Sequence, residues 1–222
     1  MRLSSSYQET KHILLAIIIL TAIFSFNDKA ETFNAEKYAI NLILTLVIVT
    51  LSIFVHLLTM KSISMHYGIK SEFTLWSFEE IANINPVNWK KIKKSFRVIY
   101  SGSLFALLLT LVSNGRAYFT AVSTFKIEKT KTIGRQFPNI TEKEIANIAF
   151  LIIFTHFILA IIFKILGVKL GVLVNTWIIV WNLIPISSLL GAKIFFGSRT
   201  MYIFSIILGI ITLGLINVIT GV

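Results

Sequence analysis

Long apolar runs separated by short polar stretches dominate the pattern of hydrophobic and polar positions along the chain. We interpret five of these runs as membrane spans, at residues 12–26, 39–60, 145–166, 172–195 and 201–219. About 20 apolar residues in a helix, rising about 1.5 Å each, are enough to cross a bilayer. The pattern therefore predicts an all-α polytopic membrane protein that forms one membrane domain over residues 1–222.

The first run is shorter than a usual span, so we expect tilted neighbours or a thin membrane to accommodate it. It follows a short basic start, as a signal peptide would. No small-residue cleavage pattern follows Phe26, however, and we expect this run to be a retained span.

Two segments between the spans have the pattern of β-strands. Residues 71–76 alternate in polarity, and residues 118–127 are rich in aromatic and β-branched side chains. Both features are typical of strands. Since both segments lie outside the predicted spans, we expect short cytoplasmic strands beside the helical bundle.

The number of spans depends on the segment 98–122, whose first part is apolar but contains Ser and Gly residues. If it crosses fully, there are six spans and the basic residues divide 11 to 10 between the two sides. If it re-enters or lies on the surface, there are five spans and one side carries 17 of the 21 basic residues. The second division obeys the positive-inside rule. It predicts a re-entrant or surface-lying segment 98–122 and a cytoplasmic N-terminus.

Composition agrees with this class of protein. The chain is 55% hydrophobic with a mean hydropathy of +0.81, and its net charge of +11 is expected from basic loops at the cytoplasmic face rather than from nucleic-acid binding. It contains no Cys, which excludes disulfides and thiolate zinc sites. The partner that this composition predicts is membrane lipid.

The last turn of the second span, residues 56–60, contains a candidate for catalysis or metal binding. An ionisable side chain inside an apolar span is costly and marks a functional candidate. Here it is His56. A zinc peptidase helix with the pattern HExxH would continue with Glu and a second His, but this chain has Leu57 and Met60 in those places.

Three segments in order resemble the archaeal branch of the site-2 protease family of intramembrane zinc metalloproteases. Residues 56–60 followed by 65–76 are similar to the HExxH helix with its Tyr-Gly element and Glu-Phe-x-Leu-Trp strand. Residues 141–163 are similar to the middle core helix, and residues 175–193 to the third, whose usual motif is Asn-Leu-Leu-Pro followed by Leu-Asp-Gly. The likeness implies a site-2-protease-like helical bundle.

The same resemblance implies that the catalytic residues are lost. In the family, two His and one Asp hold zinc and the Glu after the first His activates a water. Only His56 matches. Leu57 stands at the general base, Met60 at the second His and Leu190 at the Asp. The resemblance therefore predicts a pseudoprotease without a cofactor.

His156 leaves an alternative open. It falls where the middle helix of the family usually presents an Asn, so His56 and His156 can face each other across the bundle. One hypothesis is a non-standard zinc site with Glu72 or Glu144 as a further ligand. The other is a pair of neutral imidazoles bonded to Ser, Thr or backbone carbonyls.

Asn182 and Pro185 match the remaining part of the third motif. By resemblance, this stretch breaks the helix and presents backbone groups to an extended substrate. The alternative is a proline kink whose freed carbonyl is met by neighbours such as Ser187 or Ser188.

These observations lead to three functional hypotheses. The first is a non-catalytic pseudoprotease that binds a transmembrane or peptide segment, or serves as a subunit of a membrane complex. The second is an active metalloprotease with a non-standard site at His56 and His156. The third is a structural or transport component with polar positions along a path. The resemblance places the protein in an archaeal plasma membrane.

Overall fold

The computed structural model describes residues 6–26, 34–77, 101–128 and 140–220. This part of the chain is mostly helical with two strands. The elements in chain order are α1 (Tyr7–Ser25), α2 (Ala35–His66), β1 (Lys70–Leu75), α5 (Ser101–Val112), β2 (Ser123–Glu128), α6 (Glu142–Ile165), α7 (Lys169–Asn182), α8 (Leu190–Gly197) and α9 (Arg199–Thr220).

Within the described ranges, four helices are long and apolar enough to cross a membrane: Tyr7–Ser25, Ala35–His66, Glu142–Ile165 and Arg199–Ile216. They coincide with the predicted spans 12–26, 39–60, 145–166 and 201–219. All four helices begin two to five residues before these apolar runs, since polar residues form their first turns. The chain is thus a helical protein with several helices suited to a membrane.

Local signals fix where three of these helices begin. The Ser6 side chain accepts a hydrogen bond from the Glu9 amide, and the Asn34 side chain accepts from the amides of the first turn of α2. Thr141 and Glu144 form a reciprocal capping box at the start of α6. Such caps satisfy amides that have no partner within the helix.

The predicted span 172–195 is not one continuous helix. It is divided into α7 and α8, with residues 183–189 between them. Pro185 lies in this break, where its missing N–H costs no helical bond. Gly191 packs so closely on the backbone of residues 182 and 183 that a Cβ atom would clash with the Leu183 carbonyl. The Leu183 carbonyl, which follows the last residue of α7, accepts a hydrogen bond from the Tyr202 hydroxyl at 3.2 Å, and the Ser187 hydroxyl has no hydrogen-bond partner within the described residues.

Helix α5 occupies the first part of the segment 98–122; residues 98–100 lie outside the described ranges. Its 12 residues rise about 18 Å, less than the roughly 30 Å of a bilayer core. Strands β1 and β2 pair antiparallel, from Lys70 opposite Glu128 to Leu75 opposite Ser123. The first coincides with the predicted strand. The second begins five residues later than predicted, after turns at residues 121–122.

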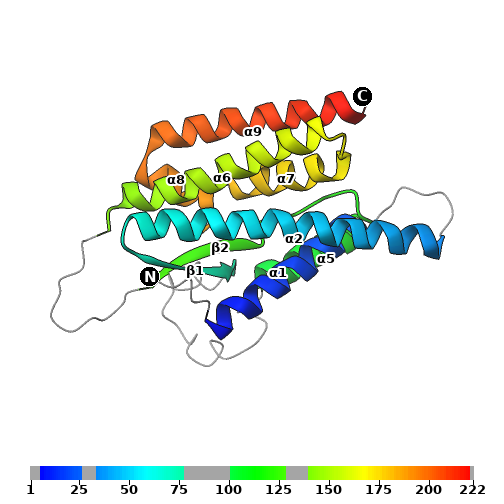
Figure 1. The fold of residues 1–222 in the computed structure, drawn as a ribbon, viewed down its shortest axis with the longest axis horizontal. Coiled ribbons are helices and arrows are strands. Elements are labelled where there is room, and N and C mark those ends of the chain that lie inside the picture. The colour runs from blue at the N-terminus through cyan, green and yellow to red at the C-terminus, as the bar shows by residue number, and fades with distance from the viewer. Residues whose placement is uncertain (1–5, 27–33, 78–100, 129–139, 221–222) are drawn as a thin grey trace.

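The elements are stacked in layers around α2 (Figure 1). Helices α6 and α7 pack on one side of α2, with α9 beyond them, and α1 and the sheet pack on the other side. Because α2 lies between the two groups of elements, its buried face is where residues from distant parts of the sequence meet.

Candidate functional site

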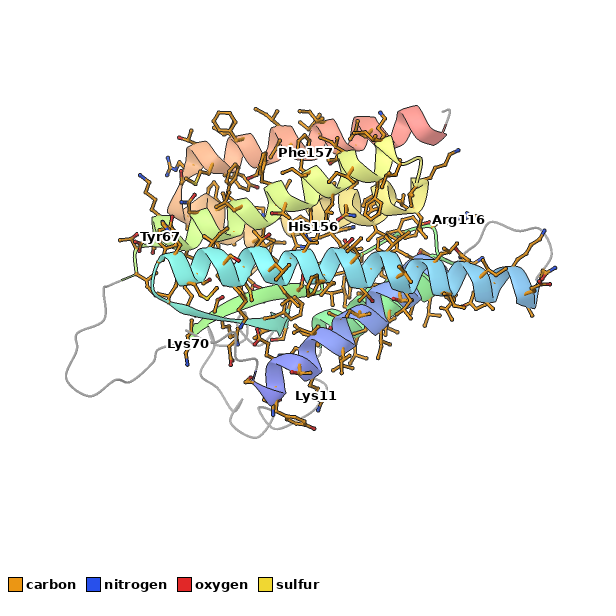
Figure 2. The ribbon with its side chains drawn as sticks, viewed as in Figure 1. Lys11, Tyr67, Lys70, Arg116, His156 and Phe157 are labelled. Atoms are coloured by element: carbon orange, nitrogen blue, oxygen red, sulfur yellow. The ribbon has the colours of Figure 1, made fainter. Side chains whose placement is uncertain are left out.

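Two buried imidazoles meet at the contact between α2 and α6. The Nδ1 atom of His56 lies 3.1 Å from the Nε2 atom of His156, and both side chains are fully buried. His156 lies between α6 and α2 (Figure 2). Ser52, His56 and Met60 are spaced by four residues and so share one face of α2. All three are buried.

Asn175 on α7 extends this contact into a chain of polar side chains. Its Oδ1 atom lies 2.8 Å from Nδ1 of His156. Its Nδ2 atom donates to Ser52 Oγ at 3.1 Å and to the Gly171 carbonyl at 2.8 Å. The chain therefore ties α2, α6 and α7 together inside the bundle, where water cannot replace a missing partner.

The bonds of Asn175 determine where the protons lie. Both hydrogens of its amide nitrogen are used, so its oxygen must accept from His156 Nδ1. In a neutral imidazole the other nitrogen is then an acceptor. His156 Nε2 accordingly accepts from His56 Nδ1, and His56 Nε2 is left as a buried acceptor with no hydrogen-bond partner within the described residues.

Apolar side chains occupy the three positions that the resemblance aligns with catalytic residues. Met60 and Leu190 are fully buried, and Leu57 packs against the core from a half-buried position. Phe73 of β1 stands edge-on to the His56 ring, with 5.7 Å between the ring centroids. Neither an alkyl side chain nor a phenyl ring takes a proton from water, so no general base stands beside His56 at these positions.

The described residues do not fit a zinc site. They contain no group of three or more His, Cys, Asp or Glu side chains placed to hold a metal ion. Catalytic zinc uses three protein ligands. Glu144 is bound in the cap of α6, about 18 Å along the helix from His156. Glu72 lies next to Phe73 on β1, so its side chain points to the opposite face of the strand.

A cation of the protein itself lies nearby. The Lys193 ammonium on α8 donates to Thr124 Oγ1 at 2.8 Å and to the Phe125 carbonyl, and lies 3.9 Å from the centre of the Phe125 ring. Its charge interacts with His56. Thr124 in turn donates to the Ser188 carbonyl. The segment between α7 and α8 is thereby fastened to β2, and the site contains a fixed positive charge.

Asn182 and Pro185, the candidates for a peptide groove, differ in exposure. Asn182 is fully buried, and its Nδ2 atom donates to the Ile178 carbonyl one turn back in α7 at 2.9 Å. Pro185 is exposed. The Asn182 amide nitrogen thus bonds to its own helix, and the exposed residues of the break are Pro185 and Ile186.

The sequence predicts that His56 and His156 can face each other, but it does not indicate which residues bind them. Ser52 lies one helical turn before His56, a spacing that marks it as a neighbour on the same face. Asn175 was identified only through its resemblance to the third core helix. The pairing of Lys193 with β2 has no local signature, because it joins residues 69 positions apart.

No protein-family model, no curated protein and no solved structure matches this chain.

Proposed function

We propose that the protein is a non-hydrolytic membrane scaffold of the site-2-protease-like type, which binds a transmembrane helix or peptide segment instead of cleaving it. It acts in the plasma membrane with its N-terminus in the cytoplasm. The proposal combines the resemblance of three sequence segments with the chemistry of the buried site.

The observation that carries the proposal is the use of both imidazoles in a hydrogen-bonded chain. Both nitrogens of His156 and Nδ1 of His56 are engaged. A metal ion held between His56 Nδ1 and His156 Nε2 would have to replace the hydrogen bond that joins these two atoms.

Helix α9 offers a surface to which a partner can bind. Only 17% of the apolar stretch of α9 is buried, a smaller share than in the other three candidate spans. Its exposed side chains include Ile203, Phe204, Ile207 and Ile210. In a bilayer such a face packs against lipid or against another helix.

Metal analysis with a peptidase assay tests the proposal. The purified wild type and His56→Ala are compared for bound zinc and for cleavage of a panel of transmembrane peptides in detergent micelles. We expect less than stoichiometric zinc in both and no cleavage by either.

The same experiment tests the alternative function, a metalloprotease with a non-standard site at His56 and His156. Stoichiometric zinc in the wild type that is lost in His56→Ala, together with cleavage, would overturn the scaffold proposal. Co-purification of a stable membrane partner with the wild type would support it.

A further inference from the structure

The outer edge of β1 faces α1 and α2, and its backbone groups can be assigned. The Trp76 amide donates to the Val122 carbonyl, so even-numbered residues of this strand bond to β2. In an antiparallel pair, the residues between them turn their N–H and C=O groups away from the partner strand. Ser71 and Phe73 therefore present their backbone groups at the outer edge, where a third strand would bind.

Side chains from α1 and α2 bind these backbone groups of Ser71 and Phe73. The Phe73 amide donates to Glu9 Oε1 at 2.9 Å, and the Ser71 carbonyl accepts from Lys61 Nζ at 2.6 Å. His12 hydrogen bonds to the Phe73 backbone as well. Each group offers the edge what a neighbouring strand would offer, an acceptor for the N–H and a donor for the C=O.

A buried ion pair holds this arrangement together. Glu9 is 1% exposed and its carboxylate lies 2.7 Å from Lys61 Nζ, whose side chain is 19% exposed. Glu9 belongs to the first turn of α1, which Ser6 caps. Buried pairs often contribute little net stability, but they fix one arrangement in preference to others. Charged side chains at a strand edge are also a means of preventing unwanted pairing.

We propose that the start of α1, together with Lys61 of α2, blocks the outer edge of the sheet. Glu9, His12 and Lys61 take the place of a third strand, and an extended peptide can pair with β1 only after the Glu9–Lys61 bond opens. The inference concerns the sheet and not the imidazole pair, so it stands or falls independently of the proposed loss of hydrolysis.

Amide hydrogen exchange by NMR tests this directly. In the wild type, the amides of Phe73 and Trp76 are both protected, one by Glu9 and the other by β2. In Glu9→Ala/Lys61→Met we expect the Phe73 amide to exchange about tenfold faster while the Trp76 amide stays protected. Adding an excess of a peptide with the β2 sequence, residues 123–128, should restore protection of Phe73 in the variant and leave the wild type unchanged.

Two comparisons keep the test decisive. Glu36→Ala, in the exposed first turn of α2, should exchange like the wild type. The isosteric Glu9→Gln retains an acceptor for Phe73 and should show a smaller effect in the same direction if the double variant does not fold. Loss of protection at Phe73 and Trp76 together would mean that Glu9 only supports the sheet, and would overturn the proposal. Unchanged protection of Phe73, or no effect of the peptide on the variant, would overturn it as well.

Discussion

The side-chain oxygen of Asn175 lies 2.8 Å from Nδ1 of His156. This bond joins α7 to α6 in the interior of the bundle and fixes the proton on the imidazole. As a result, two His side chains that the sequence offers as metal ligands are members of a hydrogen-bonded chain that ends at Ser52.

Asn175→Leu should lower the free energy of unfolding by about 1–3 kcal/mol, because it leaves the His156 N–H without an acceptor in a buried place. Thr176→Val is the matched control: Thr176 is equally buried, and its hydroxyl has no hydrogen-bond partner within the described residues. This control should be neutral or stabilising. Thermal unfolding in detergent micelles measures both variants, and equal effects would contradict the assignment.

The proton positions themselves can be measured. We expect both His56 and His156 to be neutral with the proton on Nδ1 and with Nε2 unprotonated. The reason is that the Asn175 oxygen accepts from Nδ1 of His156, whose Nε2 then accepts from Nδ1 of His56. Long-range ¹⁵N–¹H correlation spectra of the His-labelled protein distinguish the two tautomers. A proton on Nε2 of His156 would show that the chain runs in the opposite direction.

Introducing the catalytic residues of the site-2 protease family at the positions that resemble its motifs tests the resemblance. The triple variant Leu57→Glu/Met60→His/Leu190→Asp should bind one zinc ion, since it supplies two His one turn apart and a carboxylate from α8. In the control, Leu58→His replaces Met60→His and directs the second imidazole away from His56. We expect no zinc in that control. Failure of a folded triple variant to bind zinc would argue against a site-2-protease-like arrangement.

Gly191→Ala should be strongly destabilising, because its Cβ would clash with the Leu183 carbonyl, a rigid backbone group. A cost of about 2 kcal/mol or more is expected from a forced backbone shift. Gly214 is the control. A Cβ there meets nothing within 4 Å in the middle of α9, so Gly214→Ala should leave the melting temperature unchanged or raise it. Equal melting temperatures of the two variants would refute the close approach of α8 to α7.

Lys193→Met should weaken the attachment of α8 to β2 by removing two hydrogen bonds and a cation–π contact. We expect a loss of about 1–3 kcal/mol in unfolding free energy. Lys143→Met, at an exposed position in the first turn of α6, should have little effect. Faster amide exchange at Thr124, which pairs with Thr74 of β1, in Lys193→Met alone would locate the loss. No difference between the two variants would show that the Lys193 contacts do not hold β2.

The long helices could be predicted because a helix that spans a membrane consists of a continuous run of apolar residues. Asn182 and Pro185 predict a break or a kink within the run 172–195, and the structure has a break there. The apolar pattern itself continues through the break, so it does not show that Gly191 packs on the backbone of α7. Periodicity detects burial but not a change of direction within a buried segment.

The candidate site was predictable in part. His56 and His156 stand out as ionisable residues in apolar runs. Thr141 and Glu144 form the pattern of a capping box, and reading that local signal would have excluded Glu144 as a metal ligand. The Glu9–Lys61 pair joins residues 52 positions apart, so no local sequence pattern predicts it. Such contacts follow from the arrangement of α1, α2 and β1 in space, which a single sequence does not specify.

The end of α7 has a consequence for how the chain enters the membrane. This helix rises only about 21 Å, and its terminal carbonyl at Leu183 relies on the hydroxyl of Tyr202, a residue synthesised later. Until α9 is synthesised, that carbonyl lacks this donor. We therefore expect α7, α8 and α9 to partition from the translocon into lipid as one hairpin-like unit, so that truncation before residue 202 leaves α7 unintegrated.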